Sequence, residues 1–568
     1  MSRKSLLLLL IGIIIVVPFI YFYSMRVAYL TILPFVPSGD DIAAHVYYTY
    51  QVFHDPMAGL PKLRDGGLAV PGPYPNIIHY PMSLILLFSD EPIMVAKAYG
   101  MFSFFFVITG IFLYTFIIWF NLRDKFLTLL TPILMTLLSP RAIQTLGDGS
   151  IFELFTIYIV SPLIILLNDR LFLAGFLIGL SSLNYFGIFE VILITSPFVV
   201  INFLKREKHQ FIRFILGIVC GGNIFLFRFF YHILYGVVLA LFLPQIPPST
   251  PLRSSSLLPF DRYGSYMFLS NANSWIFYFA LLLGVGNLLL TSYLRIKKHV
   301  LDPREKTSLL FTISWLSLIF FTFLPLLEKV SIGSSMQERI LRISSQLSIL
   351  PIISFTYLFR RVLQLSFLSR LISFKVIVGR GEHNKTYKFK FHKNRIIILF
   401  TSLIVLMLSF FTTPSLYAIL LSNPGGLIRI DSEEYTMLQQ IKGMVLKDER
   451  NIVIVAPNQV ASWVLPLLTD FKRNISVVFI TMTLPDNTSP WYAKYFEIYL
   501  GLTEKNEVLL KKYNVKYIVA IPPKKDQWYN DNNRKFSLYL WNEDFSEIAE
   551  LVYSLQYNSG GVKVWKMR

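Results

Sequence analysis

Charged residues are scarce in this chain of 568 residues, and cysteine is almost absent. Only 15% of the residues are charged, against about 25% in ordinary soluble domains. Hydrophobic residues make up 54%, which excludes a disordered chain because disorder requires low hydrophobicity. The one cysteine, Cys220, excludes an internal disulfide. This composition disfavours a purely soluble enzyme.

The positive charge of the chain is concentrated in its apolar part. Residues 421–568 hold 18 basic and 16 acidic residues, whereas residues 1–420 hold 35 basic and 18 acidic ones. Nucleic-acid-binding proteins place basic residues on a solvated face rather than between long runs of Leu, Ile and Phe. We therefore expect no nucleic-acid partner and relate the charge to a membrane.

Long apolar runs predict membrane-spanning helices, because a bilayer requires roughly 20 apolar residues per helix. Eleven runs meet this description, near residues 5–23, 93–120, 126–138, 151–167, 171–184, 188–204, 214–243, 275–294, 307–327, 341–359 and 396–420. Those near 126–138, 171–184 and 188–204 are short. The first run follows Arg3 and Lys4, and we expect a retained anchor rather than a cleaved signal peptide.

The distribution of charge between the runs indicates their orientation. With a cytoplasmic N-terminus, the predicted inner segments hold 24 basic and 6 acidic residues, and the rest of the membrane part holds 11 and 12. This asymmetry follows the positive-inside rule. We expect a polytopic α-helical membrane protein of about 11 transmembrane helices, with its N-terminus inside and its C-terminus outside. Residues 1–420 would form the membrane domain, with a first outer loop over 24–92.

Ordinary α/β patterning begins after residue 420. Ser432 to Lys447 reads as a helix with an N-cap serine and acidic residues in its first turn. Buried strands are predicted near residues 451–456, 475–480 and 516–521, with a final strand at 562–565. No Gly-rich phosphate loop, nucleophile elbow or metal-spaced cluster is visible here. Residues 421–568 are therefore expected to be an extracytoplasmic α/β domain.

The first outer loop gathers residues suited to catalysis. A helix is expected to begin near Asp41, which places Asp41 and His45 at i and i+4 on one face. A carboxylate beside an imidazole suits base catalysis or metal binding. The structural alternative is that Asp40 or Asp41 only caps the helix, since aspartate is a favoured N-cap. Tyr74 and His79 follow later in the same loop.

A divalent cation such as Mg²⁺ or Mn²⁺ is a further alternative for this loop. The available ligands are Asp40, Asp41 and His45, with His54 and His79 nearby in sequence. Their spacing matches no standard metal site.

Two further polar clusters lie where predicted outer loops enter spans. One contains Arg141 and Glu153, and the other contains Arg339 and Arg342, which are i, i+3 neighbours on one helix face. Interfacial arginines commonly extend to lipid headgroups. The alternative is that they hold a lipid phosphate through charge-assisted hydrogen bonds.

Taken in order, these features resemble the GT-C membrane glycosyltransferases. Four loose motifs carry the resemblance: Asp41 and His45 with Tyr74-Pro75; Gly149 with Glu153-Leu154 and Pro162-Leu163; Gln337 and Arg339; and Leu509 to Val519 in the tail. Gln337 and Arg339 stand one residue closer than the family pattern. The outer domain lacks a Trp-Trp-Asp-type motif, which disfavours transfer of a whole oligosaccharide to Asn.

The resemblance implies transfer of a sugar from a polyprenyl (dolichyl) phosphate donor to an extracytoplasmic glycan, lipid or protein acceptor, with inversion. It implies Asp41 or Asp40 as general base, and Arg339 and Arg342 with Arg141 as holders of the leaving phosphate. Substrate contacts are expected from His45, Tyr74, His79 and Glu153. The alternatives are a transporter or flippase for lipid-linked glycans, and a non-catalytic membrane assembly protein. Few charges within the spans and no internal repeat disfavour the transporter.

Overall fold

The computed structural model describes most of the chain in sixteen segments. They are residues 41–54, 78–138, 151–182, 187–204, 210–222, 271–296, 299–322, 343–344, 346–364, 373–378, 385–390, 432–457, 463–480, 490–523, 531–557 and 560–568. The chain divides into two compact units. Unit 1 contains the described residues within 106–142 and 153–418, and unit 2 those within 22–105, 143–152 and 419–568.

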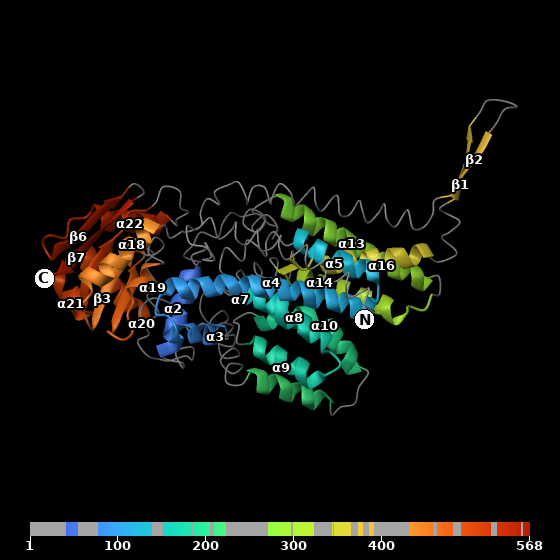
Figure 1. The fold of residues 1–568 in the computed structure, drawn as a ribbon, viewed down its shortest axis with the longest axis horizontal. Coiled ribbons are helices and arrows are strands. Elements are labelled where there is room, and N and C mark those ends of the chain that lie inside the picture. The colour runs from blue at the N-terminus through green and yellow to red at the C-terminus, as the bar shows by residue number, and fades with distance from the viewer. Residues whose placement is uncertain are drawn as a thin grey trace, which may run out of the picture. The chain divides into compact units, whose positions relative to one another are not determined.

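Unit 1 is built almost entirely of helices. They are the C-terminal parts of α4 (Pro92–Leu122) and α7 (Ile151–Phe155), then α5 (Lys125–Leu138), the π-helix η2 (Thr156–Val160), α8 (Ser161–Leu166), α9 (Leu171–Ser181), α10 (Gly187–Leu204), the helix Gln210–Gly222, α13 (Asn271–Ile296), α14 (Pro303–Thr322) and α16 (Ile349–Gln364). A hairpin of β1 (Ser373–Val378) and β2 (Lys385–Lys390) follows. Helix α16 packs against α13, α14 and α5 (Figure 1).

The prediction of about 11 transmembrane helices is wrong. Within the described ranges, two helices are long and apolar enough to cross a membrane, Pro92–Leu122 and Phe277–Ile296. The runs near 126–138 and 171–184 form helices of 14 and 11 residues. The run near 151–167 is divided by the π-helix Thr156–Val160. The predicted orientation, with the N-terminus inside and the C-terminus outside, depended on the eleven spans and is no longer supported.

The other predicted runs have different outcomes. The apolar helix of the run near 188–204 extends over Glu190–Ile201, and the run near 341–359 overlaps α16, of 16 residues. The run near 307–327 overlaps α14, whose first turn carries the charged residues Arg304, Glu305 and Lys306. The runs near 5–23 and 396–420, and most of 214–243, lie outside the described residues.

Four glycines bring two short helices of unit 1 into backbone contact. A Cβ built on Gly175 or Gly179 of α9 would lie 2.3 Å from the carbonyl oxygen of Phe214 and 2.1 Å from that of Ile218. Reciprocally, a Cβ on Gly217 or Gly221 would meet backbone oxygens of α9 at 2.2 and 2.0 Å. Small residues spaced by four allow this approach, which is common between helices in membranes.

Ion pairs fasten the start of two helices to the end of α16. Arg360 lies 2.9 Å from Asp124, whose carboxylate also accepts the backbone N–H of Leu127 at the start of α5. Arg361 lies 2.9 Å from Asp302, which forms a reciprocal capping pair with Glu305 at the start of α14. These contacts satisfy helix N-termini that would otherwise lack hydrogen-bond partners.

Unit 2 contains the expected C-terminal α/β domain. Its sheet has the order β4-β3-β5-β7-β6, in which β3 is parallel to β4 and β5, and β7 is antiparallel to β5 and β6. The strands are β3 (Ile452–Pro457), β4 (Ile475–Ile480), β5 (Val515–Ala520), β6 (Ala549–Tyr557) and β7 (Gly560–Met567). The helices are α18 (Ser432–Gln440), the π-helix η5 (Ile441–Val445), α19 (Val464–Leu468), α20 (Pro490–Thr503), α21 (Glu507–Lys512) and α22 (Asp531–Asn542).

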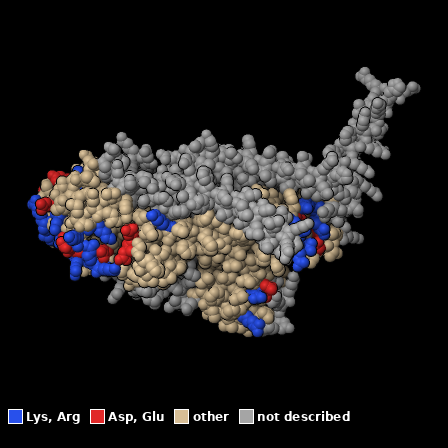
Figure 2. All heavy atoms as spheres, viewed as in Figure 1, with Lys and Arg blue, Asp and Glu red and all other residues tan. Residues whose placement is uncertain are grey.

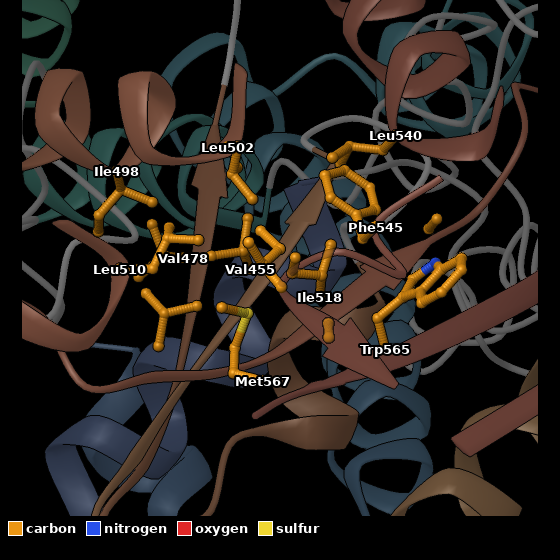
Figure 3. Close-up of a cluster of buried hydrophobic side chains, with 14 of the residues drawn as sticks. Val455, Val478, Ile498, Leu502, Leu510, Ile518, Leu540, Phe545, Trp565 and Met567 are labelled. Carbon is orange, nitrogen blue, oxygen red and sulfur yellow. The ribbon is translucent and has the colours of Figure 1, made fainter. Parts of the chain in front are cut away.

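The core of this domain lies between the sheet and its helices. Val455 of β3 and Ile518 of β5 are fully buried with Leu502 of α20 and Leu540 of α22, as Figure 3 shows. Burying such side chains stabilises the fold by about 1.5–3 kcal/mol each relative to leaving them exposed. Figure 2 shows many acidic and basic side chains on the described face of this domain, whereas unit 1 presents a mostly uncharged face.

An ionic cluster joins the segment after η5 to the sheet. Glu449 accepts hydrogen bonds from Tyr517 at 2.6 Å and lies 2.8 Å from Lys516 and 3.2 Å from Lys566. Burial alone would raise the pKa of Glu449, but these hydrogen bonds outweigh burial and lower its pKa to about 2. The carboxylate is therefore ionised at neutral pH and connects three segments of unit 2.

Candidate functional site

Two short helices of unit 2 carry the residues of the first-loop motif. Helix α2 (Asp41–His54) packs against α3 (His79–Ser83), which leads through the 3₁₀ turn η1 (Leu84–Leu87) into α4. Helix α2 also packs against α19 of the C-terminal domain. The loop segment and the C-terminal domain thus belong to one compact unit.

A buried polar cluster forms between α2, α3 and α4. His45 Nδ1 lies 3.3 Å from His79 Nε2, and the two rings are 6% and 0% exposed as residues. Thr49 donates a hydrogen bond to the carbonyl of His45 at 2.8 Å, and its hydroxyl lies 2.7 Å from the Tyr99 hydroxyl. We call His45, Thr49, His79 and Tyr99 the histidine cluster.

Within the histidine cluster, the ring of His79 is neutral at physiological pH. Burial lowers the pKa of His79 well below its usual 6.5, and the neighbouring His45 lowers it further. In the contact between the rings, one nitrogen donates and the other accepts, as a neutral imidazole allows. The contact connects α2 to α3.

We expect this depressed pKa to make stability depend on pH. The folded protein resists protonation of His79 while the unfolded chain takes up a proton near pH 6.5. The free energy of unfolding therefore falls as the pH drops from 6.5 toward the folded-state pKa, by up to about 1.4 kcal/mol per pH unit. Thermal unfolding of the wild type and of His79→Gln across this range measures the effect. The variant should lose part of the slope, and identical pH profiles would contradict the assignment.

Aromatic contacts fix the far end of α2 against the C-terminal domain. The ring of Phe471 lies 5.7 Å from that of Tyr47 and 5.2 Å from that of His54, where the rings stack. Lys472 forms an ion pair with Asp90 at 3.2 Å, in the segment that precedes α4. Tyr47 is thus a packing residue, and His54 faces Phe471.

The structure describes only some of the residues predicted for the site. Asp41 is the first residue of α2, so its position lies one turn before His45 on the same helix face. His45 and His79, predicted separately, are brought into contact. The remaining predicted positions lie outside the described residues: Asp40, Tyr74, Arg141, Arg339, Arg342 and the side chain of Asp41.

Glu153 belongs to unit 1 and is deeply buried. It is 2% exposed, and its Oε1 atom has no hydrogen-bond partner in the described structure. The π-helix Thr156–Val160 follows directly, and its first carbonyl accepts a hydrogen bond from Ser161 at 2.9 Å. π-Helical turns are frequent at functional sites, so Glu153 is a second candidate site.

The side chains of Asp40 and Asp41, which the magnesium or manganese alternative requires, lie outside the described residues. Over the described ranges, no group of three or more His, Cys, Asp or Glu residues is placed to hold a metal ion. His45 and His79 offer imidazole nitrogens, whereas Mg²⁺ prefers oxygen ligands. We therefore assign no chemical step to a cation.

Sequence patterns did not reveal Thr49 and Tyr99 as members of the site. Thr49 has a visible signal, because it follows His45 by four residues on the same face of α2. Tyr99 lies within an apolar run in which nothing distinguishes it.

Comparison with known proteins adds no family: no protein-family model matches the chain, and no curated protein matches it.

Proposed function

We propose that this chain is a membrane-bound glycosyltransferase that moves a sugar from a polyprenyl (dolichyl) phosphate to an extracytoplasmic acceptor. The observation that carries the proposal is the contact between His45 and His79, 34 residues apart in sequence, in a buried polar cluster one helical turn from Asp41. Buried polar groups that converge beside a carboxylate position are typical of catalytic sites. The motif resemblance supplies the reaction class.

The chemistry is an inverting displacement at C1 of the sugar. The acceptor oxygen forms a bond to C1 while the bond from C1 to the phosphate oxygen breaks. The acceptor proton passes to the carboxylate of Asp41, and the electron pair leaves with the polyprenyl phosphate. In this proposal Arg339, Arg342 and Arg141 stabilise the charge that grows on the leaving phosphate. The histidine cluster holds the start of α2 against α3 and α4.

Exposed apolar helix faces support a membrane location for the proposed enzyme. Helix α4 leaves Phe105, Phe112 and Phe120 between 36% and 62% exposed, and α13 leaves Leu282 and Leu289 about two-thirds exposed. Large exposed apolar surfaces are rare on soluble monomers and mark contact with lipid or protein. We assign these faces to membrane lipids, where a lipid-linked donor is also located.

The test is transfer of labelled sugar in membranes that contain the full chain. Synthetic polyprenyl phosphates that carry radiolabelled mannose, glucose or galactose serve as donors, and the label is followed from the lipid donor into product. We expect transfer with the wild type and none with the Asp40→Asn/Asp41→Asn double variant at equal abundance. Equal product from both proteins would remove the catalytic assignment. Mass spectrometry of cell-surface glycans from a deletion strain then identifies the acceptor.

A transporter or flippase for lipid-linked glycans is the second candidate, favoured by Glu153. A buried carboxylate with an unpartnered oxygen among helices is a typical feature of transport pathways. A transporter would move labelled donor between vesicle leaflets without breaking the bond to phosphate. Glu153→Gln would then stop the movement while the double aspartate variant would not.

A further inference from the structure

A short apolar surface precedes α4 directly. Within five residues, Leu84 is 58%, Leu87 65% and Phe88 89% exposed. Leu86, between them, is buried, as is Met82 of α3. One side of the turn therefore packs into unit 2 while the other presents three large apolar side chains. We call residues 84–88 the apolar turn.

The apolar turn is an ordered structure with internal backbone hydrogen bonds. The N–H groups of Phe88 and Ser89 both donate to the carbonyl of Ile85, at 2.9 and 3.1 Å. Ser83 donates from its hydroxyl to the carbonyl of Tyr80 at 2.7 Å. Because these polar groups are satisfied within the segment, the turn can enter a medium with little water at low cost.

The position of the apolar turn links it to the first candidate span. Only Ser89, Asp90 and Glu91 separate it from Pro92, where α4 begins. Three residues extend at most about 10 Å, so the turn lies close to the N-terminal end of α4. Asp90 and Glu91 are exposed, and Asp90 pairs with Lys472. Apolar groups beside charged groups at the end of a span are typical of a membrane–water interface.

We propose that the apolar turn is an interfacial anchor, which inserts Leu84, Leu87 and Phe88 between the headgroups and acyl chains of the bilayer. The inference rests on the membrane location of α4 in the proposed function. His79 precedes Leu84 by five residues, so the anchor holds the histidine cluster near the bilayer surface. A lipid-linked phosphate lies at that depth, which gives the anchor a role in bringing donor and site together.

The lone cysteine of the chain allows a direct test. Cys220, which is exposed, is replaced by Ser, and single variants Phe88→Cys, Phe112→Cys and Val508→Cys are labelled with an environment-sensitive fluorophore. Each full-length protein is reconstituted into phosphatidylcholine vesicles. Val508 is the matched control, because it is an apolar residue of α21 that is 77% exposed. Phe112 reports the membrane location of α4.

We expect quenching of the label at position 88 by lipids with a shallow doxyl group to exceed that at position 508 by about twofold or more. Aqueous iodide should quench in the opposite order. If iodide reaches positions 88 and 508 equally while lipid quenches position 112, the anchor is wrong and the membrane location of α4 stands. If lipid quenches none of the three, the membrane location itself fails. If the label at position 88 is shielded from iodide but is not quenched by lipid, and the shielding is lost when the protein is diluted, a second copy of the chain covers the turn. That result would overturn the anchor.

Discussion

Asp41→Asn is expected to lower the rate of sugar transfer by roughly 10²- to 10⁴-fold, the usual contribution of a general base. The sequence names Asp41 or Asp40 as the base, and Asp41 stands four residues before His45 in α2. That position lies one turn from His45, whose ring is held by His79. Asparagine keeps the size and the capping capacity of aspartate but cannot accept the proton.

The single variants separate the two aspartates. We expect Asp40→Asn to retain most of the rate, since Asp41 is the aspartate that stands four residues before His45 in the sequence. Asp90→Asn is the matched control, because it removes an exposed carboxylate in the same unit. Among the described contacts of its side chain, Asp90 pairs only with the exposed Lys472. Initial rates at equal protein abundance measure all three. Loss in Asp40→Asn with a normal rate in Asp41→Asn would move the base to Asp40.

The C-terminal strands were predictable where they are buried on both faces. Residues 452–457 form a continuous apolar run, and residues 515–520 are apolar apart from Lys516; the structure forms β3 and β5 there. Strand β6 was missed because most of its residues are exposed and it carries no buried run. A strand at the edge of a sheet depends on pairing with its neighbour, here β7, and that pairing leaves little trace in composition.

The number of spans was wrong because hydropathy records apolar content but not where a helix ends. The run near 151–167 changes from α to π geometry at Thr156, and α9 ends at Ser181 after 11 residues. Apolar residues in such short helices are also buried by protein, as the glycine contact between α9 and Gln210–Gly222 shows. Composition alone does not distinguish burial in protein from burial in lipid.

The candidate site was predictable as a set of residues but not as a contact. His45 and His79 are separate polar residues in the sequence, and their 3.3 Å contact depends on how α2 and α3 pack. Residue spacing gives information within one helix, which is why the position of Asp41 relative to His45 could be expected. Residue spacing gives no information about contacts between different helices, so the contact of Tyr99 with Thr49 was not predicted.

Gly179→Leu is expected to lower the melting temperature of unit 1 strongly. The added Cβ would lie 2.1 Å from the carbonyl oxygen of Ile218 and 2.7 Å from the backbone nitrogen of Gly222. These are backbone atoms, so the helices must separate rather than a side chain rotate. Overpacking of this kind costs about 1–3 kcal/mol, occasionally more, and Gly179→Ala should give a smaller loss. Thermal unfolding of the detergent-solubilised protein measures both.

Gly443→Ala supplies the control for the glycine contact. A Cβ at Gly443 meets nothing within 4 Å, so this change should be neutral or stabilising by up to about 1 kcal/mol. If replacing any glycine destabilised the protein, the Gly443 and Gly179 variants would both melt at lower temperatures. If the close helix contact is the cause, only the Gly179 variants melt at lower temperatures. If Gly179→Leu melts with the wild type, α9 and Gln210–Gly222 are not held together by their backbones, and their apolar faces must instead be covered by another partner.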